Sequence, residues 1–316
     1  MQLRDVDTFI HPHHRHRTDV RYIKKTLDTK MSADDFKDLT AYIRKSGCIP
    51  TATPFDERSV DFCQELELPM LKIASSDIND WVLIEKIATT RKPVVASTGG
   101  STLKDIDDLV TFFENRRIPL AVNHCVSLYP SEDGQLELNQ IDFLRNRYPG
   151  ITIGFSTHEY HDWSSSIMMA YAKGARTFER HIDIDADGIA VAPYCTLPEQ
   201  CDQWFKAFKK AKEMCGAPGT DKRQPPQGEI EYLDGLVRGV YAKHDLPAGH
   251  RLRPDDVFLA IPLLKGQLSC RELIEGEELA RPVAALGAVT IDDLDNPYSR
   301  TQSLHDQISN RGLATE

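Results

Sequence analysis

Short runs of β-branched and apolar residues recur along this chain at nearly constant intervals, and each run ends in small or polar residues. The runs occupy residues 48–53, 70–75, 92–97, 119–125, 151–156 and 176–181. Their last residues are 22, 22, 28, 31 and 25 positions apart. Such spacing leaves room for a helix that returns the chain to the start of the next parallel strand. The pattern therefore predicts a repeated strand and helix unit.

Amphipathic stretches between the runs predict helices over 33–46, 56–67, 80–91, 102–117, 138–147, 163–174 and 198–215. A closed (β/α)8 barrel needs eight strands, whereas six are visible, and the segment before residue 32 offers at most a strand remnant. We therefore expect an α/β fold, a TIM-type barrel that lacks about its first two strands. Such a barrel would leave unpaired edges at 48–53 and 176–181.

The repeat stops near Gly216. Residues 216–235 begin with a stretch rich in Gly, Pro and charge, which is typical of a linker. Short strand-like runs separated by turn residues follow and predict a small β-rich module. We expect a partial barrel over 1–215, a linker over 216–235, the module over 236–285 and a C-terminal tail over 286–316.

Composition and charge disfavour several classes of protein. The formal charge of −10 disfavours nucleic acid as a partner. No stretch approaches the roughly 20 apolar residues that cross a bilayer, and the N-terminus lacks a signal-peptide core. The seven cysteines are scattered without a C-x-x-C pair, so they read as reduced thiols. A cytoplasmic protein without membrane contact is expected.

Polar residues follow the predicted strands, and strand ends form the active-site face of a βα barrel. Repeated hydroxyls, Lys72 and the glycines at 99 and 100 can surround a phosphate with donors. His158 and His181 lie just past neighbouring strands. Each alone could cap a strand, but as a pair among hydroxyls they favour a shared metal ion. The histidine-rich segment 11–16 also contains arginines, so we interpret it as a solvated or substrate-contacting loop.

These motifs resemble those of the N-acetylneuraminate (sialic acid) synthase family. The matching segments, in chain order, are TPFDERSVDF, LKIASSD, PVVASTGGS, HCVSLYP, GFSTH and ERH. Residues 236–285 resemble the C-terminal antifreeze-like (SAF) module of that family. The resemblance implies condensation of phosphoenolpyruvate with an N-acyl-hexosamine, or its 6-phosphate, to a nine-carbon α-keto sugar acid with release of phosphate. It also implies a homodimer formed through the SAF module.

The resemblance assigns roles to individual residues. His158 and His181 would hold a divalent metal, with Mn expected and Mg or Co as alternatives. Lys72 and Asp77 would be catalytic. The substrate-binding positions would be Gln2, Thr53, Ser75, Ser97, Ser127, Tyr129 and Ser156. Gln2, Tyr129 and the catalytic Asp77 would face the sugar.

Several positions depart from the family pattern. Asp77 stands where most relatives have Glu, and Ser127 stands where many have Asn. Ala192 and Pro193 replace a Pro-Asp-His-like element after the second histidine. Met1 takes the middle position of a Lys-Phe-Gln-like motif, so a phosphate-binding lysine and the first strand with its glutamate are expected upstream.

Two other readings stay open. The chain could be a non-catalytic relative that binds a sugar or a partner, or a truncated inactive fragment. It could also be a synthase of the 3-deoxy-octulosonate type, but such enzymes would not carry the SAF module.

Overall fold

Seven parallel strands organise the first of two units in the computed structural model, which describes residues 1–316 except 187–189, 218, 273, 296 and 315–316. The units are Met1–Gly216 and Ala217–Glu316, and each is described by itself. The strands are β1 (Gln2–Leu3), β2 (Thr53–Pro54), β3 (Leu71–Ile73), β4 (Val94–Ser97), β5 (Leu120–Cys125), β6 (Thr152–Thr157) and β7 (Thr177–Arg180).

The strands follow one another in chain order. Strands β3 to β7 form one parallel sheet, β1 pairs with β2, and a parallel bridge between Ala52 and Leu71 joins the two sets. The expectation that 48–53 would be an unpaired edge is wrong, because Thr53 N donates to Met1 O at 2.9 Å and the first residues add a strand there. Only the last residue of that predicted run belongs to β2. The edges are β1 and β7, which share no ladder within the described residues.

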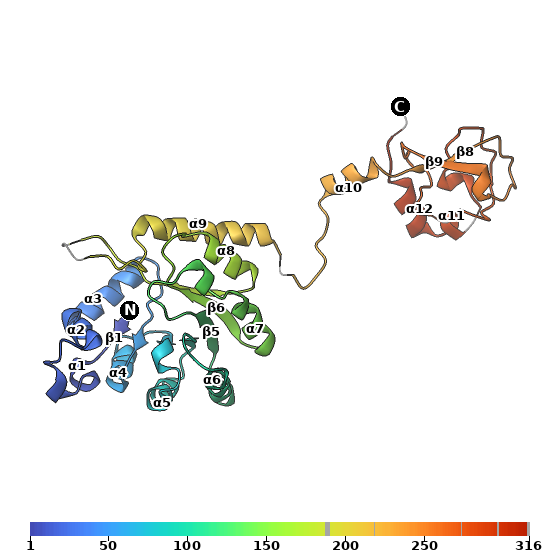
Figure 1. Ribbon diagram of the computed structural model, residues 1–316. Helices are drawn as coiled ribbons and strands as arrows, with labels where there is room; N and C mark the ends of the chain where they lie inside the picture. Colours follow the sequence, from blue (N-terminus) through green and yellow to red (C-terminus); the bar gives the residue numbers. More distant parts are fainter. Residues whose placement is uncertain (187–189, 218, 273, 296, 315–316) are drawn as a thin grey trace. The chain divides into compact units, whose positions relative to one another are not determined.

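Helices surround the strands (Figure 1). The longer ones are α3 (Ala33–Lys45), α4 (Glu57–Glu65), α5 (Trp81–Thr89), α6 (Leu103–Asn115), α7 (Asn139–Arg147), α8 (Ser165–Ala172) and α9 (Pro198–Cys215). Each lies within a range predicted from the sequence. Side-chain caps explain several starts: Ser32 with Asp35 and Thr102 with Asp105 form capping boxes at α3 and α6.

The remaining elements of this unit are two α-helices and three 3₁₀ turns among the described residues. They are α1 (Val6–Phe9), η1 (Pro12–His14), α2 (Arg21–Asp28), η2 (Ser75–Asp77) and η3 (Asp133–Gln135). Together with the curled parallel strands they make an α/β half-barrel, the architecture that the strand and helix repeat predicts.

The core lies between the sheet and its helices. Alternate strand residues such as Ile73, Ala96, Val122 and Phe155 are at most 2% exposed and pack in one cluster with helical residues such as Phe113. Burial of these side chains against the helices contributes the main apolar stabilisation. The same alternation sends the intervening residues to the inner face of the curled sheet.

A polar layer fills the inner face of the middle strands. Thr177 Oγ1 donates to Asn123 Oδ1 at 2.6 Å, and Gly154 lies between them in the register. A Cβ at Gly154 would lie 1.9 Å from Thr177 Oγ1 and 2.1 Å from Asn123 Oδ1. Glycine is therefore required there by close approach of its neighbours.

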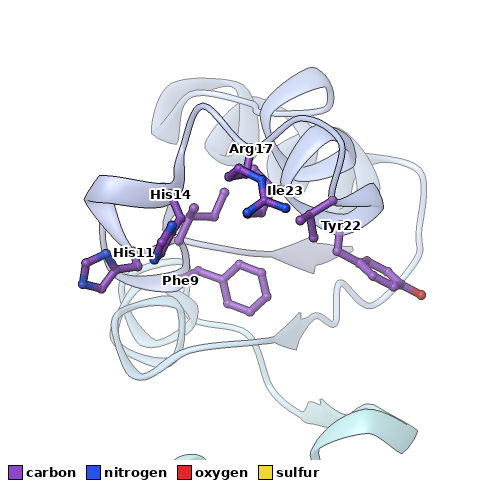
Figure 2. Close-up of a pocket in the computed structure, with 8 residues that line it drawn as sticks. Phe9, His11, His14, Arg17, Tyr22 and Ile23 are labelled. Atoms are coloured by element: carbon purple, nitrogen blue, oxygen red, sulfur yellow. The ribbon is translucent and has the colours of Figure 1, made fainter.

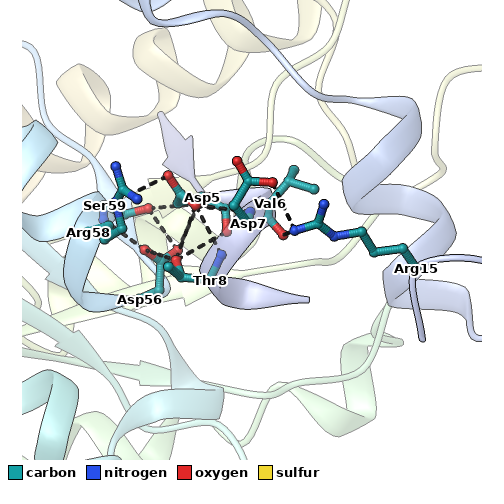
Figure 3. Close-up of polar contacts among 8 residues, drawn as sticks. All are labelled: Asp5, Val6, Asp7, Thr8, Arg15, Asp56, Arg58 and Ser59. Carbon is teal, nitrogen blue, oxygen red and sulfur yellow. Dashed lines mark hydrogen bonds and ion pairs between the residues drawn. The ribbon is translucent and has the colours of Figure 1, made fainter. Parts of the chain in front are cut away.

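The N-terminal segment is tethered to α4 through Asp56 (Figure 3). Asp56 accepts from Asp5 N at 2.8 Å and also from Ser59 N at 2.8 Å, so one carboxylate caps α4 and holds the first residues of the chain. Arg15 forms an ion pair with Asp7 at 2.8 Å on the same segment. The tether fixes the chain just after β1.

The second unit, Ala217–Glu316, has its own apolar core. Its elements are α10 (Gln227–Asp234), β8 (Gly239–Ala242), η4 (Pro254–Asp256), β9 (Val257–Ala260), η5 (Ile291–Asp293), α11 (Pro297–Arg300) and α12 (Gln302–Ser309). Strands β8 and β9 are antiparallel. Helix α10 lies in the segment expected to be a linker, and Ile308 of the expected tail packs in the core with Val240, Leu268 and Val289. Among the described residues of the whole chain, no helix is long and apolar enough to cross a membrane.

We predict that Asp56→Ala lowers the free energy of unfolding by about 2–3 kcal/mol, because it removes both a helix cap and a charged hydrogen bond to the N-terminal segment. Asp80→Ala is the matched control, since Asp80 caps α5 through Leu83 N and should cost about 1 kcal/mol. Urea unfolding measures both. Equal losses in the two variants would show that the tether adds nothing.

We also predict an acid-sensitive contribution from His124, whose Nε2 lies 2.7 Å from Leu136 O within the core. Burial lowers the pKa of His124 below its ordinary 6.5. As the pH falls below about 6.5, His124 binds a proton in the unfolded chain but not in the folded chain, so the free energy of unfolding falls. His124→Gln should make the dependence of unfolding free energy on pH shallower by up to about 1.4 kcal/mol per pH unit. An unchanged slope in urea unfolding between pH 7 and pH 5 would contradict this.

Candidate active site

The strand register gathers the predicted polar residues on one face. Lys72 pairs with Val95, Ser97 with Asn123, Cys125 with Ser156, and Ser156 with Glu179. Partners in a parallel ladder point the same way, and residues two apart share a face. Lys72, Ser97, Ser156 and Glu179 therefore all project from the inner face, near the carboxyl ends of their strands.

A glycine lets three predicted segments meet. Gly99 N donates to Ser75 Oγ at 3.0 Å. A Cβ at Gly99 would lie 2.1 Å from Ser127 Oγ and 3.0 Å from Ser75 Oγ. The loops after β3, β4 and β5 thus converge on one backbone position. Cys125 lies in the same region, because it is buried and pairs in register with Ser156, and burial raises the pKa of its thiol.

Ser97 Oγ and Asp77 Oδ2 are buried in this region and lack a hydrogen-bond partner among the described residues. Burial raises the pKa of Asp77 above its ordinary value, although Arg4 and Lys72 oppose the shift. Buried polar atoms are rarely left unpaired. These two groups are therefore available to a ligand, and Asp77 holds a proton more readily than an ordinary aspartate.

His158 and His181 lie side by side, with ring centroids 5.2 Å apart. His158 Nδ1 is 2.8 Å from Val126 O. Because a carbonyl only accepts, Nδ1 carries the hydrogen and Nε2 keeps its lone pair. Burial lowers the pKa of each ring to about 4, and the cations Lys25, Lys72 and Arg180 add to the effect at His181. Both imidazoles are neutral near pH 7, which is the form that binds metals.

The pair fits a divalent metal as a two-ligand site. One ion bound at about 2.0–2.1 Å by each ring can span the separation. No cluster of three or more His, Cys, Asp or Glu suited to a metal occurs among the described residues. The remaining coordination positions would therefore belong to water or substrate. The metal itself stays a prediction.

Two tyrosines pack against the histidines. The Tyr129 ring lies 4.0 Å from His158 and 5.9 Å from His181, between centroids. Tyr194 lies 5.2 Å from His181 and 5.1 Å from Tyr129. The sequence predicts a role for Tyr129 but not for Tyr194, because the stretch around Ala192 and Pro193 departs from the family pattern. Residues 187–189 of that stretch lie outside the described residues.

Lys72 has an anionic partner within the chain. Its Nζ lies 3.2 Å from Glu179 Oε1, and its side chain is 14% exposed. The sequence placed Glu179 at a strand end without a role. Its inward position was recoverable from alternation, because it is two residues before His181.

Some predicted residues lie toward the edge of the site. Thr53 is buried and pairs in register with Gln2 of β1. The Gln2 side chain is exposed, and its Oε1 accepts from Arg4 Nη1 at 3.2 Å. Arg4 also interacts electrostatically with Asp77, which links this edge to the sugar-side aspartate.

The histidine-rich segment forms a different hollow. A cavity of about 420 Å³ lies there, and its lining includes Phe9, His11, His14 and Arg17, which Figure 2 draws as sticks. Arg17 is held by Asp19 through bonds of 2.7 and 2.6 Å. Its lining includes neither His158 nor His181.

Comparison with known proteins identifies the family. Residues 2–218 match the NeuB family and residues 237–295 match the SAF domain. The chain belongs to the NeuB family. The SAF match extends ten residues beyond the 236–285 expected from the sequence. The strand-end motifs are therefore those of this family, as the resemblance indicated.

Relatives in the NeuB family carry related names. The N-acetylneuraminate-9-phosphate synthase of Drosophila melanogaster is 33% identical over 281 residues, which cover 79% of this chain and 73% of that protein. The N,N'-diacetyllegionaminic acid synthase of Campylobacter jejuni is 30% identical over 216 residues, which cover 67% of this chain and 63% of that protein. These relatives are synthases of nonulosonic acids, which assigns the chain to an enzyme family of that general type.

A solved structure shares the fold of this NeuB-family chain. It is the provisionally named spore coat polysaccharide biosynthesis protein E of Chromobacterium violaceum, with 38% identity and a TM-score of 0.89. The likeness covers 93% of this chain and 88% of that one.

Proposed function

We propose that this NeuB-family chain condenses phosphoenolpyruvate with an N-acyl-hexosamine, of the N-acetylmannosamine type or its 6-phosphate. The product is a nine-carbon α-keto sugar acid, and inorganic phosphate leaves. The main support for the proposal is the pairing register of strands β3 to β7. This register places Lys72, Ser97 and Ser156 on the inner face of the sheet, the face from which the two histidines also project. The names of the relatives support the same type of product.

Phosphoenolpyruvate would lie among the hydroxyls and Lys72. Ser97 Oγ, buried and without a partner in the described part of the chain, can donate to a phosphate or carboxylate oxygen. The hydroxyls of Ser75 and Ser127 lie close to the backbone of Gly99, and Lys72 supplies positive charge. Preorganised donors of this kind stabilise charge that moves during reaction.

The sugar would lie toward Asp77 and Tyr129. With its pKa raised by burial, Asp77 can donate a proton to the sugar carbonyl oxygen as the new carbon–carbon bond forms. A divalent metal, with Mn proposed first and Mg or Co as alternatives, would be held by His158 and His181 and supply Lewis acidity toward that carbonyl. Water then adds at the former enol carbon and returns a proton to Asp77. Cleavage of the bond between that carbon and the phosphate oxygen releases phosphate, which takes the hydroxyl proton as the keto group forms. The homodimer through the SAF module stays a prediction from the family.

Phosphate release from phosphoenolpyruvate tests the proposal. We expect release with N-acetylmannosamine or its 6-phosphate when Mn is present, and at least a 100-fold lower kcat/KM in His158→Ala, because several kcal/mol of carbonyl polarisation are lost. His161→Ala is the matched control, since this exposed histidine contacts Glu132 instead. Full activity in His158→Ala would remove the metal assignment. No release with any N-acyl sugar would favour the non-catalytic or inactive reading.

A second prediction concerns the meeting point of the loops. Gly99→Ala should lower kcat/KM for phosphoenolpyruvate about 100-fold, because the new Cβ displaces Ser127 and Ser75 from their positions. Gly150→Ala is the control, as a Cβ there meets nothing within 4 Å. Steady-state kinetics with thermal unfolding separates a local effect from a loss of folding. Equal kcat/KM in the two variants would contradict convergence on Gly99.

A further inference from the structure

A buried ion pair lies directly behind the two metal histidines. Arg180 Nη1 is 2.6 Å from Glu159 Oε1, and the two side chains are 2% and 1% exposed. Glu159 follows His158 in the chain, and Arg180 precedes His181. Each member of the pair is thus bonded covalently to one of the residues that would bind the metal.

The pair faces away from the site. Arg180 pairs in register with Thr157, whereas Glu179 pairs with Ser156. Alternation therefore directs Arg180 to the helix side of the sheet, opposite the inner face. Its guanidinium lies 4.4 Å from the Trp163 ring. Arg180 does not reach substrate, so any role in the reaction must be exerted through its neighbours.

The donors of Arg180 join three separate segments. Besides the carboxylate, Arg180 donates to Glu159 O at 2.5 Å and, through Nε, to Thr196 Oγ1. The carboxylate of Glu159 also accepts from Ser166 and Thr157. The loop after β6, the end of β7 and the segment carrying Thr196 are thus held by one side chain.

Thr196 continues the connection to the site. Its N–H donates to His181 O at 2.9 Å, and its O accepts from Asp183 N at 3.0 Å. Tyr194, which packs on His181, lies two residues before it. On the other side, His158 O accepts from Ser131 N at 3.1 Å, two residues after Tyr129. Both tyrosines and both histidines are therefore attached to the same framework.

We propose that Arg180 is a positioning residue that, through Glu159 and Thr196, fixes the spacing of His158, His181 and Tyr194 for metal binding. A buried ion pair is weak evidence of stabilisation, because desolvation of the two charges offsets their attraction. A fully bonded network of this kind instead holds its members in one geometry. Arginine is required because its planar fork reaches several acceptors at once, whereas lysine offers a single ammonium. This inference rests on the metal assignment in the proposed function.

Cobalt(II) binding to the full-length chain tests the inference, followed by the visible absorption of the bound ion. Arg180→Lys keeps the positive charge but removes the guanidinium group, whose several N–H donors hold the network together. Its cobalt affinity should fall about 10- to 100-fold, as for other residues that support metal ligands. Thr196→Val removes one acceptor with little change of shape and should shift the spectrum and weaken binding by a smaller factor. Arg147→Lys is the matched control. It alters an exposed pair in which Arg147 donates to Asp107 at 2.8 and 2.6 Å, and its cobalt affinity should equal that of the unmodified chain.

Circular dichroism identifies the variants that fold. If Arg180→Lys does not fold, Thr196→Val decides the question. Unmodified cobalt affinity and spectrum in every folded network variant would overturn the positioning role. A parent chain that binds no cobalt would overturn the metal assignment and this inference together. Phosphate release is measured separately, so a chain that binds cobalt through this network but forms no product would refute only the proposed reaction.

Discussion

The pairing register of strands β3 to β7 decides which side chains meet at the mouth of the half-barrel. In a parallel ladder a shift of one residue exchanges the two faces of a strand. Such a shift in β6 would turn Phe155 inward and bury Ser156 among the helices. The cost of exposing Phe155 and Ile153, both 2% exposed, prevents that exchange. The apolar contacts on the outer face therefore determine the chemistry of the inner one.

Cationic side chains lie near the site of this acidic protein, and two of them form ion pairs, Lys72 with Glu179 and Arg180 with Glu159. Lys72, Arg4 and Arg180 lie around the histidines and Asp77, although the whole chain carries a formal charge of −10. Burial keeps the two imidazoles neutral and favours the protonated carboxyl of Asp77. Both effects follow from the same low-dielectric surroundings. An anionic ligand would meet few competing negative charges there, with Glu179 already engaged by Lys72.

Much of the architecture could be predicted because its signals are local. Caps such as Ser32 and Thr102 mark helix starts, and runs ending in polar residues mark the strands and most of the site. The adjacency of His158 and His181 follows from neighbouring parallel strands. Arg180, Glu159 and Tyr194 could not be assigned in this way, since their contacts join separate segments, such as Tyr194 with Tyr129 and Arg180 with Glu159. The pairing of β1 with β2 was missed for the same reason, because a two-residue strand carries no periodicity of its own.

Asn123, Gly154 and Thr177 form the floor beneath this site, and their crowding has an evolutionary consequence. Any side chain larger than hydrogen at position 154 would collide with both neighbours, whose own hydrogen bond crosses above it. The added carbon would also lie 2.4 Å from the backbone oxygen of Thr177, so new side chains at positions 123 and 177 could not by themselves make room for it. Related chains with the same strand pairing should therefore keep glycine at position 154, independently of which sugar they accept.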